Sequence, residues 1–275
     1  MPELPEVETT RRGLATVMPG RVLRHFVVHE PRLRWPVPAD LPARVGGQTV
    51  LDCQRRGKYL LIRFAGGTQI VHLGMSGSLR RVPAATPLLK HDHAEWVFDG
   101  AVFRLHDPRR FGAILWHDAA DGPLEAHPLL SRLGLEPFDP AFTPQYLYAQ
   151  TRGKRVSIKQ ALLAGNIVVG AGNIYASEAL FRARINPRTA AGKVSLPRCA
   201  ALVDAVKLTL EQALASGGST LRDYVDATGQ PGAYFTLHAA VYEKAGKPCP
   251  ACGTAIRRIV QGQRATYFCP ACQKR

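Results

Sequence analysis

The first part of the chain, from about residue 20 to residue 117, alternates short apolar segments with glycine-rich breaks. Short segments rich in β-branched and aromatic side chains and bounded by glycines are typical of strands. Asp99-Gly100 stands between two such segments and predicts a two-residue hairpin turn. We therefore expect an antiparallel β-sandwich or flattened barrel in this region. The expected strands cover residues 22–28, 48–55, 59–64, 69–73, 94–98 and 102–106.

Helical periodicity lies on both sides of this region. From Pro5 onward, Val7, Leu14 and Met18 fall on one helical face, which predicts an N-terminal helix. Residues 118–150 are proline-rich and are expected to form an irregular linker. The chain is thus predicted to be α+β. Helices are expected at 156–163, 174–182 and 197–214, and domains at 1–133, 134–236 and 237–275.

Charge narrows the class of partner. Lysines and arginines number 36 against 21 acids, a formal charge of +15, and they are spread along the whole length. Such an excess predicts a polyanion as partner. An acidic membrane surface is the alternative, but it would require a basic amphipathic helix or a long apolar segment, and we find neither. The acidic chain start does not resemble a signal peptide, so we expect a cytoplasmic protein with no membrane partner, and DNA as the polyanion would place it at the nucleoid.

Four of the six cysteines form two Cys-Pro-Ala-Cys pairs, separated by sixteen residues, near the end of the chain. This spacing predicts one structural zinc ion with a closed set of four thiolates. Two disulfides are the alternative, disfavoured in a reducing compartment. Segments 256–260 and 265–268 are expected to form a basic β-hairpin between the pairs, and Cys53 and Cys199 to be buried free thiols. The predicted zinc ligands are Cys249, Cys252, Cys269 and Cys272.

The chain start carries candidate chemistry. Removal of Met1 would leave Pro2 as a secondary α-amine beside the carboxyl group of Glu3. An α-amine titrates near pH 8, so a sizeable fraction is a free nucleophile at neutral pH, and a secondary amine forms an iminium that stays cationic. The alternative is an ordinary frayed tail before an amphipathic helix.

Three tight turns of the predicted sheet carry reactive or bulky side chains. Met75 and Phe111 stand at glycine-bounded tips, Arg109 lies beside Phe111, and Lys58 follows Gly57. In a basic protein such side chains suit insertion between bases and contact with phosphates. Inward packing of Met75 and Phe111 is the alternative.

Histidines around position 92 invite a metal interpretation. His91, His93 and Glu95 lie close in sequence, but His-x-His on a strand does not supply a full ligand set, so support of a phosphate-facing surface is favoured.

Glycines mark two further segments. Gly170-Ala171-Gly172-Asn173 leads directly into a predicted helix and suits an anion, with Lys159 nearby, although tight packing explains the same pattern. The glycine-rich segment 217–235 suits either a mobile lid or a plain connector.

The motifs together resemble those of bacterial formamidopyrimidine-DNA glycosylases. The matching segments are 2–9, 72–77, 107–112 and 172–178, followed by the four-cysteine finger, and they occur in the family's order along the entire chain. The resemblance implies an N-terminal antiparallel β-sandwich with an N-terminal helix, a helix-two-turn-helix domain and a zinc-finger hairpin. It also implies a monomeric base-excision repair enzyme, a DNA glycosylase and AP lyase acting on 8-oxoguanine and formamidopyrimidine lesions in duplex DNA by β,δ-elimination.

The resemblance also implies residue roles. Pro2 would attack the sugar, Glu3 would donate a proton to open the sugar ring, and Lys58 would assist. Met75, Arg109 and Phe111 would fill the space left by the extruded nucleotide, with Arg109 facing the orphaned cytosine. The DNA contacts would come from these three together with His72, Arg110, Lys159, Asn173 and Arg264, and base recognition from Glu6, Ser219 and Tyr234 within or near the segment that closes over the base.

Two rival functions stay open. One is the sister enzyme that acts on oxidised pyrimidines, although Leu4 and Val7 favour the purine branch. The other is a non-catalytic module that binds damaged DNA. The pair Pro2 and Glu3 discriminates, because a pure binder gains nothing from a free proline terminus.

Overall fold

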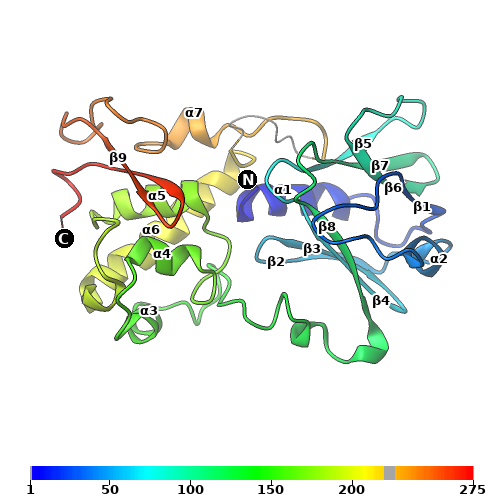
Figure 1. Cartoon of the computed structure of the whole chain (residues 1–275), viewed down its shortest axis with the longest axis horizontal. Coiled ribbons are helices and arrows are strands. Elements are labelled where there is room, and N and C mark those ends of the chain that lie inside the picture. The colour runs from blue at the N-terminus through cyan, green and yellow to red at the C-terminus, as the bar shows by residue number, and fades with distance from the viewer. Residues whose placement is uncertain (1, 220–226, 275) are drawn as a thin grey trace. The chain divides into compact units, whose positions relative to one another are not determined.

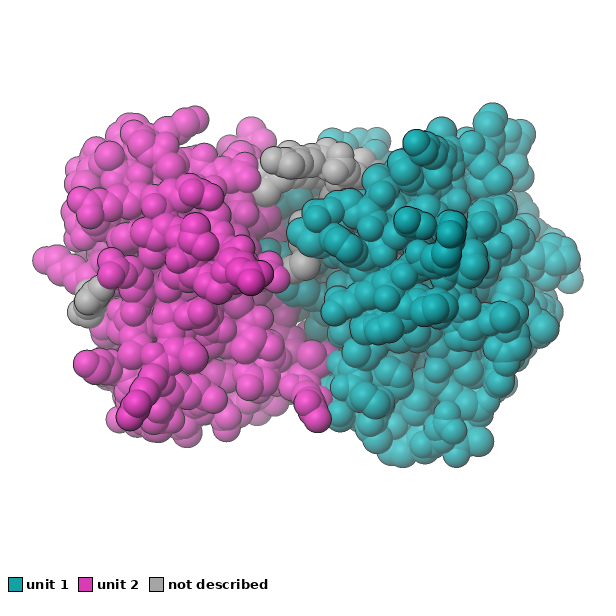
Figure 2. All heavy atoms as spheres, viewed as in Figure 1, with its two compact units in different colours: residues 1–131, 216–233 teal, residues 132–215, 234–275 magenta. Residues whose placement is uncertain are grey.

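The computed structural model describes residues 2–219 and 227–274, which Figure 1 draws as a coloured ribbon. The chain divides into two compact units, residues 1–131 with 216–233 and residues 132–215 with 234–275 (Figure 2). The segment expected to form a lid or connector, 217–235, lies partly outside the described residues, which omit 220–226.

The first unit contains two antiparallel four-stranded sheets, in the orders β1-β6-β7-β5 and β2-β3-β4-β8. One apolar core, which includes Leu60, Ile62, Trp96 and Phe103, draws its side chains from both sheets, so the sandwich prediction is confirmed. The strands are β1 His25–Val28, β2 Asp52–Arg56, β3 Tyr59–Phe64, β4 Gly67–His72, β5 Ser78–Val82, β6 Asp92–Phe98, β7 Ala101–His106 and β8 Ala113–Asp118.

Two of these strands, β5 and β8, were not predicted. Strand β5 contains Arg80 and Arg81 and lacks the apolar alternation of a typical strand, and its pairing with β7 is what makes it extended. By contrast, the predicted turn at Asp99-Gly100 is present, because Phe98 and Ala101 form the closing pair of β6 and β7.

Helix α1, Leu4–Ala15, buries Leu4, Val7 and Leu14 and packs against β2, β3 and β5. It therefore contacts strands from both sheets. The unit also contains α2, Leu41–Val45, and two short 3-10 turns, η1 Ala119–Asp121 and η2 Leu124–Ala126.

The second unit consists of helices and a β-hairpin. The helix α3 corrects the prediction that residues up to 150 form an irregular linker. Thr143 caps this helix by accepting the Tyr146 N–H at 3.1 Å, and Pro144 suits its first turn. The helices are α3 Pro144–Thr151, α4 Ile158–Leu163, α5 Asn173–Arg182, η3 Ala191–Lys193, α6 Leu196–Ala215 and α7 Tyr234–His238.

The hairpin follows near the end of the chain. Strand β9, Arg257–Gln261, pairs antiparallel with β10, Arg264–Phe268, and β10 packs against α5 (Figure 1). Gly262 and Gln263 form the two-residue turn, both with positive φ, of 52° and 61°. Positive φ at both positions is the geometry of the tight hairpin turn that matches the twist of the strands.

Candidate active site and nucleic-acid interface

The chain start is buried and held in place. Pro2 and Glu3 are both buried, and Glu3 is the N-cap of α1. The Glu6 carboxylate accepts the Glu3 N–H at 2.7 Å with one oxygen and the Ser219 N–H at 2.6 Å with the other. The start of the chain is thus an ordered element of the first unit, in contrast to the frayed-tail alternative.

Lys58 lies in the two-residue turn between β2 and β3, after Gly57, whose φ is +57°. Arg55 ties this turn to the first helix: its Nε lies 3.1 Å from a Glu8 carboxylate oxygen, and its Nη1 donates to the Gly57 carbonyl at 2.9 Å. Neither Glu8 nor Arg55 was predicted from the sequence to support this turn. The only available sequence signal was an acid on the inner part of the helix and an arginine beside the turn.

His72 ends β4 opposite Tyr59 of β3. Burial lowers its pKa to about 4, and the positive charges of Lys58 and Arg34 act in the same direction. The ring is therefore neutral near pH 7. Because Nδ1 accepts the Gly74 N–H at 3.0 Å, the ring proton must reside on Nε2, which is a hydrogen-bond donor.

Two apolar side chains at the loop tips face solvent. Met75 is 40% exposed and Phe111 is 44% exposed, so neither turns inward to pack as the alternative required. The Arg109 guanidinium lies 4.8 Å from the centre of the Phe111 ring. Arg110 has a positive φ of 54°, and its Nη1 lies 3.4 Å from the Glu30 carboxylate.

Lys159 is placed differently from the predicted phosphate contact. Its side chain is fully buried, and its ammonium donates to Asn173 Oδ1 at 2.7 Å, Thr266 Oγ1 at 2.7 Å and the Ala265 carbonyl at 3.1 Å. An ammonium group has three N–H donors, and all three are used within the protein. Lys159 therefore joins α4, α5 and β10.

Asn173 takes part in the same network. Its Nδ2 donates to the Ala265 carbonyl at 2.9 Å and lies 3.3 Å from the Tyr242 hydroxyl. Its position as the first residue of α5, after Gly172, leaves it at the positive end of the helix dipole. The sequence pattern of a glycine turn entering a helix is thus correct, while the side chain is used mainly to hold the hairpin.

Arg264 is exposed at the start of β10, next to the hairpin turn. The hairpin end is attached to the helical part of the unit, since Gln261 Nε2 donates to Ser157 Oγ at 3.0 Å. Ser157 in turn is the N-cap of α4. Arg264 therefore lies at a hairpin end that is fixed to α4.

Glu178 is a further buried acid that the sequence did not single out for a role. It is fully buried in α5 and accepts three consecutive main-chain N–H groups, from Ala240 at 2.8 Å, Val241 at 3.0 Å and Tyr242 at 2.8 Å. An acid in an otherwise apolar helical segment was the available signal. Glu178 fixes the chain that leads to the finger.

The residues predicted to recognise the base lie in different units. Ser219 is 5% exposed, and its hydroxyl has no hydrogen-bond partner among residues 2–219 and 227–274. Tyr234 belongs to the second unit, where it is fully buried, with its ring centre 5.1 Å from that of Tyr175.

The four cysteines of the finger converge on one point. Their sulfur atoms all lie within 4.8 Å of one another, with 3.9 Å between those of Cys249 and Cys272 and 3.5 Å between those of Cys252 and Cys269. Sulfurs around zinc, at a Zn–S distance of about 2.3 Å, stand about 3.8 Å apart in a tetrahedron, whereas a disulfide requires about 2.05 Å. The main-chain N–H groups of Ala251 and Cys272 point at Cys249 and Cys269 sulfurs at 3.4 Å, and N–H donors stabilise thiolates. The residues fit one structural zinc ion, and the disulfide alternative does not fit.

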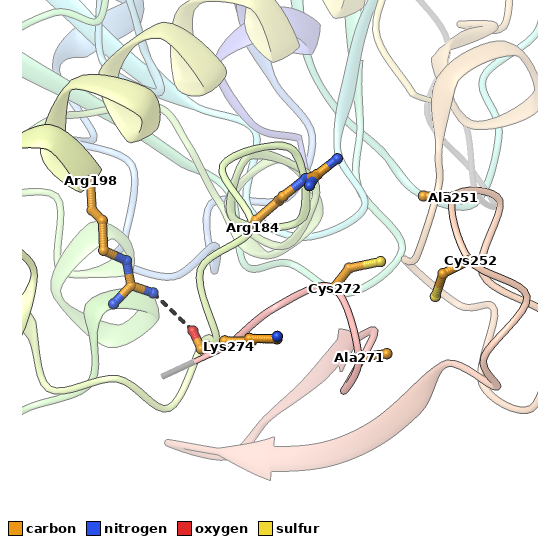
Figure 3. Close-up of a pocket in the computed structure, with 7 residues that line it drawn as sticks. All are labelled: Arg184, Arg198, Ala251, Cys252, Ala271, Cys272 and Lys274. Atoms are coloured by element: carbon orange, nitrogen blue, oxygen red, sulfur yellow. Dashed lines mark hydrogen bonds between the residues drawn. The ribbon is translucent and has the colours of Figure 1, made fainter.

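A hollow beside the cysteines is lined by cationic side chains. Arg184, Arg198 and Lys274 line it together with Cys252 and Cys272 (Figure 3). The Arg198 guanidinium donates to the Lys274 carbonyl at 2.8 Å.

The histidine alternative receives no support. His93 is buried and its Nε2 donates to the Asp107 carbonyl at 2.8 Å, so that nitrogen is already used. Among the residues that the structure describes, the four cysteines are the group able to hold a metal ion. No helix in the same described ranges is long and apolar enough to cross a membrane.

A β-sandwich with a buried chain start, a helical module and a basic four-cysteine hairpin is the architecture of a zinc-finger protein of the class that the sequence motifs resemble. Comparison with family models agrees. The formamidopyrimidine-DNA glycosylase N-terminal domain matches residues 1–114, the H2TH domain of the same enzymes matches 133–225, and the zinc finger found in FPG and IleRS matches 246–275. The chain belongs to the formamidopyrimidine-DNA glycosylase family.

Known relatives match over their full length. The formamidopyrimidine-DNA glycosylase of Bordetella pertussis (strain Tohama I) is 69% identical, with 100% of both chains covered. A point mutant of Lactococcus lactis FPG, solved with DNA containing Fapy-dG, has a TM-score of 0.91 at 32% identity and full coverage of both chains. Wild-type L. lactis FPG, solved with DNA containing an oxidised pyrimidine, has a TM-score of 0.89 at 31% identity, also with full coverage.

Proposed function

We propose that this chain is a bifunctional DNA glycosylase and AP lyase that removes 8-oxoguanine and formamidopyrimidine lesions from duplex DNA. The observation that carries the proposal is the buried chain start, where Glu6 fixes the Glu3 main chain to segment 216–219. An immobilised amine beside a carboxylic acid is suited to nucleophilic catalysis with an adjacent proton donor.

The chemistry begins at Pro2 once Met1 is removed. The Pro2 nitrogen forms a bond to C1′ of the damaged nucleotide while the bond from C1′ to the base breaks, and the base leaves with a proton. Glu3 donates a proton to the sugar ring oxygen as the ring opens, which leaves a cationic iminium. This cation acidifies the C2′–H bond, so loss of that proton expels the 3′ phosphate and a second elimination expels the 5′ phosphate.

Lys58 assists from the turn between β2 and β3. Its positive charge acts on His72, as the lowered pKa of that ring indicates, and Arg55 ties the turn to α1. A cation in a turn that is tied to the helix following the nucleophile is suited to holding a phosphate next to the reacting sugar.

Met75 and Phe111 occupy the space left when the damaged nucleotide is extruded, which costs roughly a few kcal/mol of lost stacking. Their exposure at loop tips supports this role. Arg109, stacked on Phe111, presents its planar donors to the orphaned cytosine.

The phosphate contacts come from both units. The neutral His72 donates through Nε2–H, Asn173 marks the positive end of α5, and Arg264 and Arg110 carry exposed cationic heads. Lys159 contributes indirectly, by holding Asn173 and the hairpin in place.

Base recognition is assigned to Glu6, Ser219 and Tyr234. The buried Ser219 hydroxyl, with no partner among the described residues, supports a ligand contact. Tyr234 is buried against Tyr175 within the second unit, so we assign it a supporting role there and not a direct contact with the base. We propose further that the enzyme acts as a monomer in the cytoplasm, at the nucleoid.

Oxidised pyrimidines are a second candidate substrate. The L. lactis relative is described in complex with DNA that contains an oxidised pyrimidine. The purine assignment and this alternative share the amine mechanism and differ only in the base.

Borohydride trapping tests the proposal. A duplex with 8-oxoguanine opposite cytosine should yield a covalent adduct that mass mapping places on Pro2. An N-terminal extension or Pro2→Gly should lower the trapping rate by on the order of 1,000-fold, with DNA affinity unchanged.

Pro5→Ala is the matched control, since it alters the other proline at the start of α1 and leaves the amine free. An adduct that forms only on an oxidised-pyrimidine duplex would show that oxidised pyrimidines are the substrate. No adduct on either duplex, with binding retained, would favour the non-catalytic module.

A further inference from the structure

The loops that carry Met75 and Phe111 touch each other through their main chains. Gly74 has a φ of +66°, and a Cβ added there would lie 2.4 Å from both the Gly112 nitrogen and the Phe111 carbonyl carbon. Real Cβ atoms do not approach main-chain atoms so closely, so only glycine fits. The main chains of the two loops are therefore in direct contact at Gly74.

Asp107 joins the same two loops through its side chain. Its carboxylate is fully buried, and one oxygen accepts the Ser76 hydroxyl at 2.9 Å, from the loop that carries Met75. The other oxygen accepts the Gly112 N–H at 2.7 Å, and the first also lies 3.3 Å from the Arg109 nitrogen. Donors from both loops thus converge on one carboxylate.

The main chain of Asp107 is anchored to the sheet behind the loops. Its N–H donates to the His91 carbonyl at 3.0 Å, and its own carbonyl accepts from His93 Nε2 at 2.8 Å. His93 is buried within β6, and Asp107 directly follows β7. The carboxylate is therefore held on a rigid support.

We propose that Asp107 is a positioning residue that locks the two loops together, so that Met75, Arg109 and Phe111 enter the duplex at a fixed spacing. This inference rests on the proposed function, because it assigns a support to the side chains that replace the extruded nucleotide. Loops already ordered before binding lose less conformational freedom on binding, which favours damaged DNA over the intact duplex.

Position 107 requires a carboxylate because both of its side-chain oxygens must act as acceptors. Both oxygens face N–H donors, of Gly112 on one side and Arg109 on the other. An asparagine would turn its NH₂ group toward one of these donors whichever way its amide is oriented. One of the two main-chain hydrogen bonds would therefore be lost. Buried hydrogen bonds to a charged group contribute more than neutral ones, and an unmatched buried donor is costly.

The test compares Asp107→Asn and Ser76→Ala with Asp118→Asn. Asp118 is the matched control, because it ends β8 and accepts a main-chain N–H, that of Ala120 at 2.9 Å, but its side chain is 36% exposed and pairs with Arg44. The measurement is the Kd for three duplexes: undamaged, with an uncleavable abasic analogue opposite cytosine, and with the same analogue opposite adenine.

We expect Asp107→Asn to weaken binding to the abasic analogue opposite cytosine by roughly 10- to 100-fold and to reduce the preference for cytosine over adenine. Ser76→Ala should produce a smaller loss of the same kind, about three- to tenfold. Affinity for the undamaged duplex should stay within about twofold in both variants, and Asp118→Asn should match the wild type.

An unchanged cytosine preference in both Asp107→Asn and Ser76→Ala would overturn the inference. So would a parallel loss on all three duplexes, which would indicate general unfolding. If Asp107→Asn fails to fold by circular dichroism, Ser76→Ala alone decides. Because the readout is binding to an uncleavable duplex, it stays valid even if trapping on wild-type protein fails and the catalytic proposal falls.

Discussion

Buried carboxylates hold main-chain segments in both compact units, and the second unit adds a buried ammonium group and a four-cysteine site. In the first unit, the buried carboxylates of Glu6 and Asp107 accept main-chain N–H groups and so fix the chain start and the loop tips. In the second unit, the buried ammonium of Lys159 donates to Asn173, Ala265 and Thr266, and four cysteines hold the base of the same hairpin around zinc.

This difference separates the supports of the proposed catalytic site from those of the proposed DNA-binding hairpin. The supports in the first unit consist of protein hydrogen bonds alone, so the amine chemistry should survive loss of the metal. The hairpin of the second unit contains few apolar contacts, since its buried cluster is small and two of its members are Cys249 and Cys269. Its structure therefore depends on zinc.

The largest expected effect comes from removing a zinc ligand. Cys249→Ser should weaken binding to duplex DNA by roughly 10- to 100-fold, because a finger without metal loses the fold that presents Arg264. Trapping at saturating DNA should continue at a near wild-type rate, as judged by fluorescence anisotropy for affinity and gel analysis for the adduct.

Cys199→Ser provides the control, since Cys199 is buried in α6 and does not belong to the four-cysteine cluster, so the affinity should stay intact. If Cys249→Ser protein without zinc bound duplex DNA with wild-type affinity, DNA binding would not depend on the metal.

A second pair of variants distinguishes a phosphate contact from an internal support. Arg264→Gln should reduce the slope of log K against log salt by about one, as expected for loss of a single phosphate contact. Lys159→Met should leave the slope unchanged and lower the free energy of unfolding by about 3 kcal/mol, because three buried acceptors lose their donor.

The opposite result for Lys159→Met would show that Lys159 contacts DNA and is not an internal support. A slope reduced by one with unchanged stability would restore the phosphate contact that the sequence predicted. Measurement of binding from low to moderate salt, together with urea unfolding, separates the two outcomes.

Lys159 also illustrates how far the sequence could be read. Its position among basic residues near a glycine turn predicts a phosphate contact, and nothing local indicates that Ala265 and Thr266, more than 100 residues later, supply its partners. Local signals worked where the structure is local: the hairpin turn at Asp99-Gly100 and the paired cysteines behaved as predicted.

Elements that depend on tertiary pairing were missed for the same reason. Strand β5 is extended because it pairs with β7, and its own residues carry too much charge to predict a strand. Asp107 was visible only as part of a turn motif, because its importance arises from Ser76 on another loop. Helix α3 was different, since Thr143 and Pro144 were a usable start signal that was overlooked.

The smallest expected effect concerns the pH dependence of stability in the first unit. In the unfolded chain His72 titrates near pH 6.5, whereas in the folded protein burial, with Lys58 and Arg34 nearby, lowers its pKa to about 4. Between these values the unfolded state binds more protons, so stability falls as the pH is lowered. From pH 7.5 to pH 5 this histidine should account for a loss of about 2 kcal/mol.

His72→Asn should remove that loss, because the asparagine oxygen can still accept the Gly74 N–H and cannot be protonated in this range. His25→Asn, at an exposed position of β1, should keep the wild-type pH dependence. Urea unfolding of the three proteins at both pH values gives the comparison. An identical loss in His72→Asn and wild type would mean that His72 is not held neutral by its surroundings, and would remove the reason for assigning its Nε2–H as a donor to phosphate.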